Sequence, residues 1–188
     1  GQGEDGPLGD LWRFDVGRRR WAAVAQAGEA PAPRADFGFA VDAEAEVLYL
    51  FGGRTDGTDA AGGHVFADTY ALDLATATWS RLECPGTTWR EDLRRPVAGR
   101  GPRNRPAARY APAAAVLPLA PGSGGGGGGK GPYLAVWGGL AERGASAPDD
   151  FSVLDVGVCA WYVDWDARRA LPAAGEARPA PRHGQAAA

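Results

Sequence analysis

The chain of 188 residues has no methionine and no isoleucine, and only one lysine (Lys130) and one asparagine (Asn104). Arginine, alanine, glycine and proline are abundant instead, which favours a GC-rich coding sequence. The arginine content is therefore discounted before any of it is interpreted as a binding patch. Because methionine is missing even at position 1, we expect the chain to be a piece of a longer product.

Histidine and cysteine are also scarce. His64, His183, Cys84 and Cys159 are the complete set, and none of them has the spacing of a zinc site or of a disulfide scaffold. We expect the two cysteines to be reduced thiols in a cytoplasmic protein. The sequence predicts no cofactor and no metal site.

Long apolar runs are missing as well. No stretch approaches the roughly 18 residues that cross a bilayer, and the first residues do not have the pattern of a signal peptide or a basic leader. With 45% hydrophobic residues and a formal charge of −3, the composition is typical of a soluble globular domain. We therefore expect no membrane partner.

One pattern repeats along the chain. Asp-x4-Asp-x5-Trp occurs three times with identical spacing, at 10–21 (DLWRFDVGRRRW), 68–79 (DTYALDLATATW) and 150–161 (DFSVLDVGVCAW). A fixed pattern of this kind indicates a structural repeat.

Two further features recur in register with it. Runs of β-forming residues end in Gly-Gly at 47–53 (VLYLFGG) and 133–139 (YLAVWGG). An arginine followed by small and apolar residues begins at Arg34, Arg109 and Arg182. One complete unit therefore contains an Arg-strand, a strand ending in Gly-Gly, a strand flanked by two Asp, and a strand that opens with Trp.

These units resemble the kelch repeat. The resemblance implies an all-β fold, a fragment of a kelch-type β-propeller with four-stranded antiparallel blades, two of them complete and two partial. Propellers close with about four to eight blades, so further blades of the same or another chain are expected to complete the ring. The whole chain is interpreted as one partial propeller, divided into 10–24 (last two strands of a blade), 34–82 (full blade), 108–165 (full blade with a Gly-rich insertion at 121–131) and 181–188 (first strand of a next blade).

Elementary chemistry gives each motif residue a structural role. Strands that are apolar throughout, such as VLYLF, are buried on both faces, and Gly-Gly allows the chain to leave a crowded position. The Asp carboxylates can accept backbone N–H bonds in turns, while the Trp offers a large surface to a neighbouring sheet. We expect the motif Arg to be buried against the adjacent repeat and bonded to carbonyls or an Asp. Ligand binding is the alternative role for this Arg.

Strand alternation decides which connections share a rim of the propeller. If the strands of a blade are named a to d, the b–c and d–a connections lie on one rim. The d–a connection at 83–108 is long, and the segment 81–109 carries a net charge of +5. It is either a disordered insertion or a contact surface for an acidic or phosphorylated partner. The candidate partner-binding residues are Arg54, His64, Trp89, Arg90, Arg94, Arg95, Arg103 and Arg105.

The resemblance implies a protein–protein interaction module, a scaffold that binds another protein through loops on one rim. The alternative is a fragment of a propeller enzyme, of the oxidase or specifier type, whose active-site residues lie in blades outside this chain. Within the chain itself no catalytic set is visible, so we expect no enzymatic activity here. The Gly tract lacks the strand–loop–helix context of a phosphate loop, and no strand face has the interleaved aromatics that would indicate nucleic-acid binding.

Overall fold

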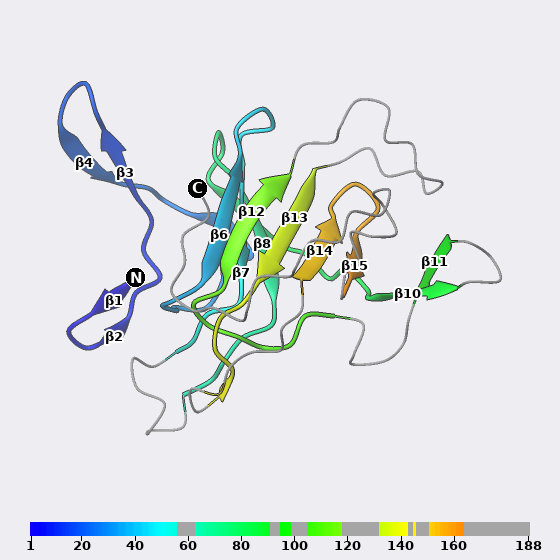
Figure 1. The fold of residues 1–188 in the computed structure, drawn as a ribbon. Helices are drawn as coiled ribbons and strands as arrows, with labels where there is room; N and C mark the ends of the chain where they lie inside the picture. Colours follow the sequence, from blue (N-terminus) through cyan, green and yellow to red (C-terminus); the bar gives the residue numbers. More distant parts are fainter. Residues whose placement is uncertain are drawn as a thin grey trace.

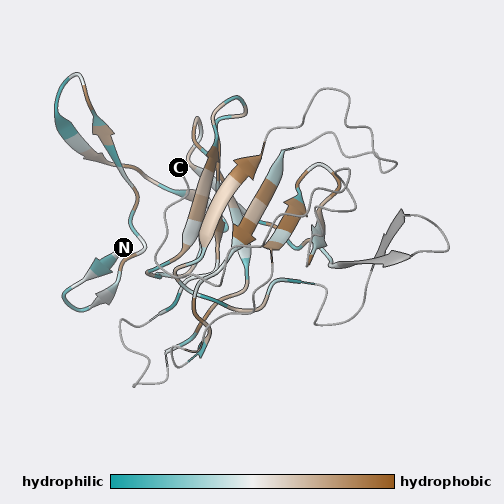
Figure 2. Ribbon diagram, viewed as in Figure 1, coloured by the Kyte–Doolittle hydropathy of each residue, from teal (hydrophilic) through white to brown (hydrophobic). Residues whose placement is uncertain are grey.

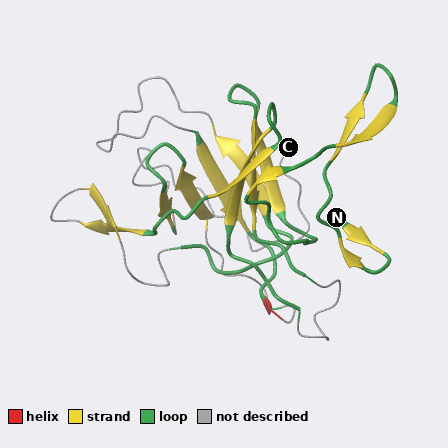
Figure 3. Cartoon of the chain, turned by 180° about the vertical axis from the view of Figure 1, so that it is seen from behind, coloured by secondary structure: helices red, strands yellow, loops and turns green. Residues whose placement is uncertain are grey.

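The structure, a computed structural model, is all-β (Figures 1 and 3). The sheets are antiparallel apart from one short parallel strand, and the described sheets do not close into a ring. The residues that the structure describes are 1–55, 63–90, 95–98, 105–117, 132–142, 145 and 151–163, with the backbone alone described at 87–90 and 95–98.

The second blade is a five-stranded sheet. Its order is β5-β9-β8-β7-β6, and β5 is the strand that runs parallel to its neighbour. The strands are β5 (Ala27–Gly28), β6 (Gly38–Asp42), β7 (Val47–Phe51), β8 (Thr69–Asp73) and β9 (Thr78–Arg81).

The third blade is a four-stranded antiparallel sheet of order β12-β13-β14-β15. It lies beside the second blade, with β12 next to β6 (Figure 1). The strands are β12 (Ala113–Leu117), β13 (Tyr133–Trp137), β14 (Phe151–Asp155) and β15 (Ala160–Tyr162).

Three short hairpins complete the described chain: β1 (Gln2–Gly3) with β2 (Gly6–Pro7), β3 (Trp12–Asp15) with β4 (Arg20–Ala23), and β10 (Thr87–Arg90) with β11 (Arg95–Ala98). The β3–β4 hairpin projects away from the two blades (Figure 1). The β10–β11 hairpin gives paired backbone to part of the 83–108 connection, which was expected to be either a disordered insertion or a contact surface. Neither strand alternates apolar with polar residues, so its backbone pairing has no periodic signal in the sequence.

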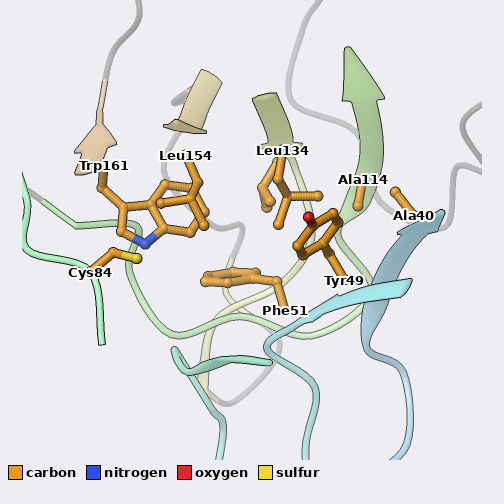
Figure 4. Packing of buried hydrophobic residues seen from close by; sticks show 9 residues of the cluster. Ala40, Tyr49, Phe51, Cys84, Ala114, Leu134, Leu154 and Trp161 are labelled. Carbon is orange, nitrogen blue, oxygen red and sulfur yellow. The ribbon is translucent and has the colours of Figure 1, made fainter. Parts of the chain in front are cut away.

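The main core lies between the two blades (Figure 4). Phe51 of β7 reaches toward the third blade, where its ring lies 5.6 Å from that of Trp161. Leu134, Val136 and Leu154 of the third blade are fully buried in the same cluster. The prediction that VLYLF and YLAVW are buried strands is therefore confirmed. Figure 2 shows apolar residues on the packed strands of the two blades.

The opposite face of the second blade forms a smaller cluster of Leu50, Tyr70, Leu72 and Trp79, against which Leu11 packs. Trp79 is buried there, and its indole N–H donates to Gln26 Oε1 at 2.6 Å. Each motif Trp of a complete blade therefore faces the preceding unit of the chain.

The two motif arginines that the structure describes, Arg34 and Arg109, are buried, as predicted. Arg34 donates to the Gly52 carbonyl at 3.0 Å and to Asp68 Oδ2 at 3.1 Å. Arg109 donates to the Ala107 carbonyl at 3.0 Å. The predicted bonds to a carbonyl and an Asp are therefore confirmed for Arg34, which also lines a pocket together with Leu8 and Leu11 of the preceding segment.

The second Asp of each motif copy closes a turn. Asp15, Asp73 and Asp155 each accept the backbone N–H three residues later, at 2.8, 2.8 and 3.2 Å. The backbone N–H bond from Thr76 lowers the pKa of Asp73, and the one from Arg18 lowers the pKa of Asp15. The predicted role of these carboxylates in turns is confirmed.

Gly-Gly ends each apolar strand for the expected reason. Gly52 and Gly53 have φ values of 68° and 96°. A Cβ at Gly52 would lie 2.4 Å from the carbonyl oxygen of Arg109, in the next blade. Glycine therefore permits both the turn and the close approach of the two blades.

The proposed division of the chain into blades stays a prediction. Its Gly-rich insertion at 121–131 and its last strand at 181–188 lie outside the described residues.

Candidate interaction rim and inter-blade pocket

An open pocket of about 300 Å³ lies between the second and third blades. It is on the rim that carries the b–c and d–a connections, because its lining comes from the segment before β8, the segment after β9 and the motif Trp of β15. The lining residues are His64, Phe66, Ala67, Asp68, Thr69, Arg81, Leu82, Glu83, Cys84, Arg105 and Trp161.

Backbone hydrogen bonds hold the wall of this pocket that precedes β8. Phe66 donates its N–H to the Gly53 carbonyl at 2.9 Å, and its own carbonyl accepts the N–H of Arg109 at 3.0 Å. The Phe66 ring is covered by the Arg34 guanidinium, whose central carbon lies 3.7 Å from the ring centroid. This wall is therefore tied to both blades.

His64 lies at the mouth of the pocket. Its backbone N–H donates to Thr55 Oγ1 at 2.9 Å, and its exposed ring lies edge-on to Phe66 at 4.6 Å. The backbone contacts fix the position of the imidazole while leaving it open to solvent.

Not every charged residue that lines the pocket has an ion-pair partner among the described residues. Asp68 is paired with the buried Arg34, and Glu83 lies 3.7 Å from Arg81 in an exposed pair. Arg105 is exposed and forms no ion pair with any other described residue. The pocket lining therefore includes the Arg105 guanidinium, unpaired among the described residues, and the exposed imidazole of His64.

The structure brings together two of the eight predicted site residues, His64 and Arg105. Arg54 is directed elsewhere: its guanidinium pairs with Asp36 at 2.7 Å and lies 4.2 Å from the centroid of the Tyr110 ring. For Trp89, Arg90 and Arg95 the structure describes the backbone pairing in β10 and β11. Arg94 and Arg103 lie outside the described residues.

Sequence reasoning missed Arg81 and Glu83 as pocket residues. Arg81 is the last residue of β9 and Glu83 follows it closely, where the chain leaves the blade toward the rim. Both could have been identified from their position at the end of the fourth strand of the blade, where the chain enters the rim.

A disulfide between Cys84 and Cys159 lies beside the pocket. The expectation of two reduced thiols was wrong. Cys84 follows β9, and Cys159 lies in the turn before β15. The fold brings them together because the backbone N–H of Trp161 donates to the Pro85 carbonyl at 2.9 Å. In Figure 4, Cys84 lies next to Trp161 in the inter-blade core.

The connection that holds Cys84 has a counterpart in the second blade. Gly86 pairs in parallel with Trp161, as Gly28 of β5 pairs in parallel with Trp79. In this register Cys84 takes the place of Gln26. The same linker position therefore holds Gln26, which is hydrogen-bonded to Trp79 in the second blade, and Cys84, which is disulfide-bonded to Cys159 in the third blade.

The described part of the chain shows neither a metal-binding cluster nor a membrane-spanning helix. It contains no group of three or more His, Cys, Asp or Glu residues placed to hold a metal ion. None of its helical segments has the length and hydropathy needed to cross a membrane.

Comparison with protein families decides the classification of this fold. The model of the KLHDC2/KLHL20/DRC7 Kelch-repeats domain matches residues 1–96, about half of the chain. The chain belongs to the kelch-repeat family. Its sheets are consistent with a fragment of a kelch propeller that is not closed.

Individual relatives are similar over a shorter part. The chain is 38% identical over 87 residues to human multiple epidermal growth factor-like domains protein 8, a match that covers 44% of this chain and 3% of the relative. It is also 38% identical over 74 residues to acyl-CoA-binding domain-containing protein 5 of Arabidopsis thaliana, covering 39% of this chain and 10% of the relative. The match thus spans only a small part of the length of each of these relatives.

Proposed function

We propose that this kelch segment binds another protein through the rim that carries the inter-blade pocket, and that the partner presents an acidic or phosphorylated segment. Membership of the kelch-repeat family supports a general protein-interaction module. The observation that carries the finer proposal is the open pocket with His64, Arg81 and Arg105 around its mouth.

The chemistry of the pocket favours an anionic group. A guanidinium binds carboxylate and phosphate in a bidentate geometry, and the free Arg105 is available for it. Phe66 and the ring of Trp161 offer apolar surface behind the charges. A peptide side chain with an anionic end and an apolar neighbour would match this arrangement.

The segment that follows Arg81 at the pocket is strongly cationic in sequence. The segment 81–109 has a net charge of +5 in a chain of net charge −3, and Cys84 anchors its beginning to the third blade. Arg94, Arg95 and Arg103 stay predicted contributors. Rim charges act mainly on the rate of association and are screened by salt.

The experiment measures binding of three labelled peptide probes: a Glu-rich peptide, its phosphoserine version and its Gln-substituted version. We expect the first two to bind more tightly than the third. Arg105→Glu combined with Arg81→Glu should weaken their binding on the order of tenfold, and raising the salt concentration should reduce the difference.

A charge-reversal control is available at Arg20, which is exposed on β4 far from the pocket. Arg20→Glu changes the net charge of the chain by the same amount per site and should leave the affinity unchanged. Equal binding of all three peptides, or equal losses for the pocket and Arg20 variants, would refute an anion-selective rim.

The disulfide also bears on the compartment. Cytoplasmic localisation was expected from reduced thiols, and that basis is gone for Cys84 and Cys159. Disulfides form and persist mainly in oxidising compartments. We infer that this segment folds in such a compartment.

A further inference from the structure

The disulfide between Cys84 and Cys159 lies where the third blade meets the pocket on the rim. Cys84 lines the pocket and is only 2% exposed. It directly follows Leu82 and Glu83, which line the pocket as well. One wall of the pocket is therefore a short piece of linker, and the disulfide ties this piece to the turn before β15.

The equivalent linker of the second blade is held by hydrogen bonds. Gln26 Oε1 accepts the indole N–H of Trp79 at 2.6 Å. The backbone N–H of Ala27 donates to the Ala77 carbonyl at 3.0 Å, and that of Glu29 donates to the Trp79 carbonyl at 3.0 Å. This linker therefore keeps its place without a covalent bond.

The third blade has fewer ways to hold its linker. The parallel register of Gly86 with Trp161 puts Cys84 at the position of the glutamine and Pro85 at the position of the alanine. Because proline has no backbone N–H, the hydrogen bond that the alanine makes cannot form here. The disulfide thus stands in for two hydrogen bonds of the second blade, and the attachment of this linker depends on the redox state of two sulfur atoms.

The two cysteines differ in their access to solvent. Cys84 is buried in the inter-blade core (Figure 4). Cys159 is half-buried, in a turn whose residues Gly157 and Val158 are exposed. The rate of thiol–disulfide exchange depends on which sulfur is attacked and on access to it. Cys159 is therefore the sulfur that an external thiolate reaches, and Cys84 is the leaving group.

We propose that the Cys84–Cys159 disulfide is a reducible control site for the anion-binding pocket, and that a dithiol reductant acts on it. This inference rests on the function proposed above. With the bond closed, the wall at 82–84 is fixed and the pocket is ready for an anionic segment. With the bond open, this wall has to be ordered when the partner binds, and the ordering costs affinity. In an oxidising compartment the closed form is the resting state, so reduction is the signal.

The exchange reaction balances in atoms and electrons. One thiolate of the dithiol attacks Cys159 Sγ and forms a mixed disulfide, while the bond to Cys84 breaks. The electron pair stays on Cys84 Sγ, which takes up a proton. The second thiolate of the dithiol then attacks the reductant's own sulfur in the mixed disulfide, and Cys159 leaves and is protonated in turn. The protein gains two electrons and two protons, and the dithiol becomes a disulfide.

The first measurement compares binding of the Glu-rich peptide and its Gln-substituted version to the full chain. Three states are used: oxidised, reduced by dithiothreitol, and reoxidised. The Glu-rich peptide should bind about tenfold more weakly to the reduced chain and recover after reoxidation. The double variant Cys84→Ala, Cys159→Ala should bind like the reduced parent with or without reductant. Alanine suits position 159, because its counterpart Ala77 has a φ of 54° and Cys159 has a φ of 51°.

Hydrogen exchange followed by mass spectrometry separates release of the linker from unfolding of the chain. On reduction, the amides at 82–86 should exchange about tenfold faster or more, and much faster than those of β7 and β13. The linker at 27–29 is the internal control, because it is held without sulfur and should not be released. Equal exchange of 82–86 and the two core strands in the reduced chain would mean that the bond holds the whole fold, and would overturn the proposal.

Binding and reduction must also influence each other in both directions. If the closed bond tightens binding tenfold, a saturating concentration of the Glu-rich peptide should make the disulfide tenfold harder to reduce, a shift of about 30 mV for this two-electron couple. The Gln-substituted peptide should leave the midpoint of reduction unchanged. Arg81→Glu combined with Arg105→Glu should remove the effect of the peptide on this midpoint but keep the release of 82–86.

The outcomes separate the two proposals. Equal affinity of the oxidised and reduced chain for the Glu-rich peptide, with selectivity over the Gln version retained, would overturn control by the disulfide and leave the function of the rim standing. Absence of that selectivity in the oxidised chain would refute the rim function, and this inference would fall with it.

Discussion

At the scale of single residues, the repeat motif places the same side chain in different environments. Trp161 fills the core between two blades, while Trp21 is exposed on a hairpin that pairs with no further strand among the described residues. The contribution of the motif Trp to stability therefore depends on its surroundings and not on the motif.

This contrast gives a direct prediction. Trp161→Ala removes a buried aromatic side chain and should lower the free energy of unfolding by about 3–5 kcal/mol. Trp21→Ala is the matched control and should cost less than about 0.5 kcal/mol, as exposed positions usually do. Denaturant unfolding of the two variants and the parent measures both values, and equal losses would contradict the assignment of complete and incomplete blades.

The motif residues were also the part of the structure that could best be predicted. The apolar strands, the Gly-Gly turns, the carboxylates that close turns and the burial of Trp79 and Trp161 follow from local chemistry repeated in register. The partners of Arg34 were predicted correctly by type, as carbonyls or an Asp. That Gly52 and Asp68 supply them did not follow, because it depends on how the strand ends are arranged.

At the scale of elements, each linker between blades pairs in parallel with the last strand of a blade. β5 runs parallel to β9, and the segment at Gly86 runs parallel to β15. Neither pairing was visible in the sequence, since two or three residues carry no periodicity. The disulfide was missed for the same reason: its two cysteines are distant in sequence and only the parallel linker brings them together. Arg54 was assigned to the rim by its place in a loop, and its pairing with Asp36 could not be read from spacing.

The linker of the third blade should contribute to stability through its disulfide. Changing Cys84 and Cys159 together to Ala should lower the free energy of unfolding by about 2–4 kcal/mol. The parent should lose a similar amount on reduction, whereas the double variant should be insensitive to reductant.

Alkylation of the folded parent provides the check on the bond itself. Its cysteines should react with iodoacetamide only after reduction, as read by mass. Labelling of both cysteines in the unreduced, folded chain would contradict the disulfide and the oxidising compartment inferred from it.

At the scale of the whole molecule, two complete blades share one core and carry an incomplete hairpin at one side. The same arrangement creates both the pocket on the rim and the exposed face of β6 on which Phe39 and Val41 lie. The fold class could be predicted because three motifs recur together. For the pocket, the sequence predicted only the rim on which it lies. Its lining could not be predicted, because the walls combine residues from both blades.

The central claim, that two packed blades carry an unpartnered hairpin, is tested most directly by native hydrogen exchange of the whole chain. Amides of core strands exchange only when large parts of the protein unfold, whereas amides at unpaired edges exchange through small local openings of low free energy. The account predicts that β7 and β13 are among the slowest segments and that β3 and β4 exchange far faster. Protection of β3 and β4 equal to that of β7 and β13, in a monomeric sample, would contradict it.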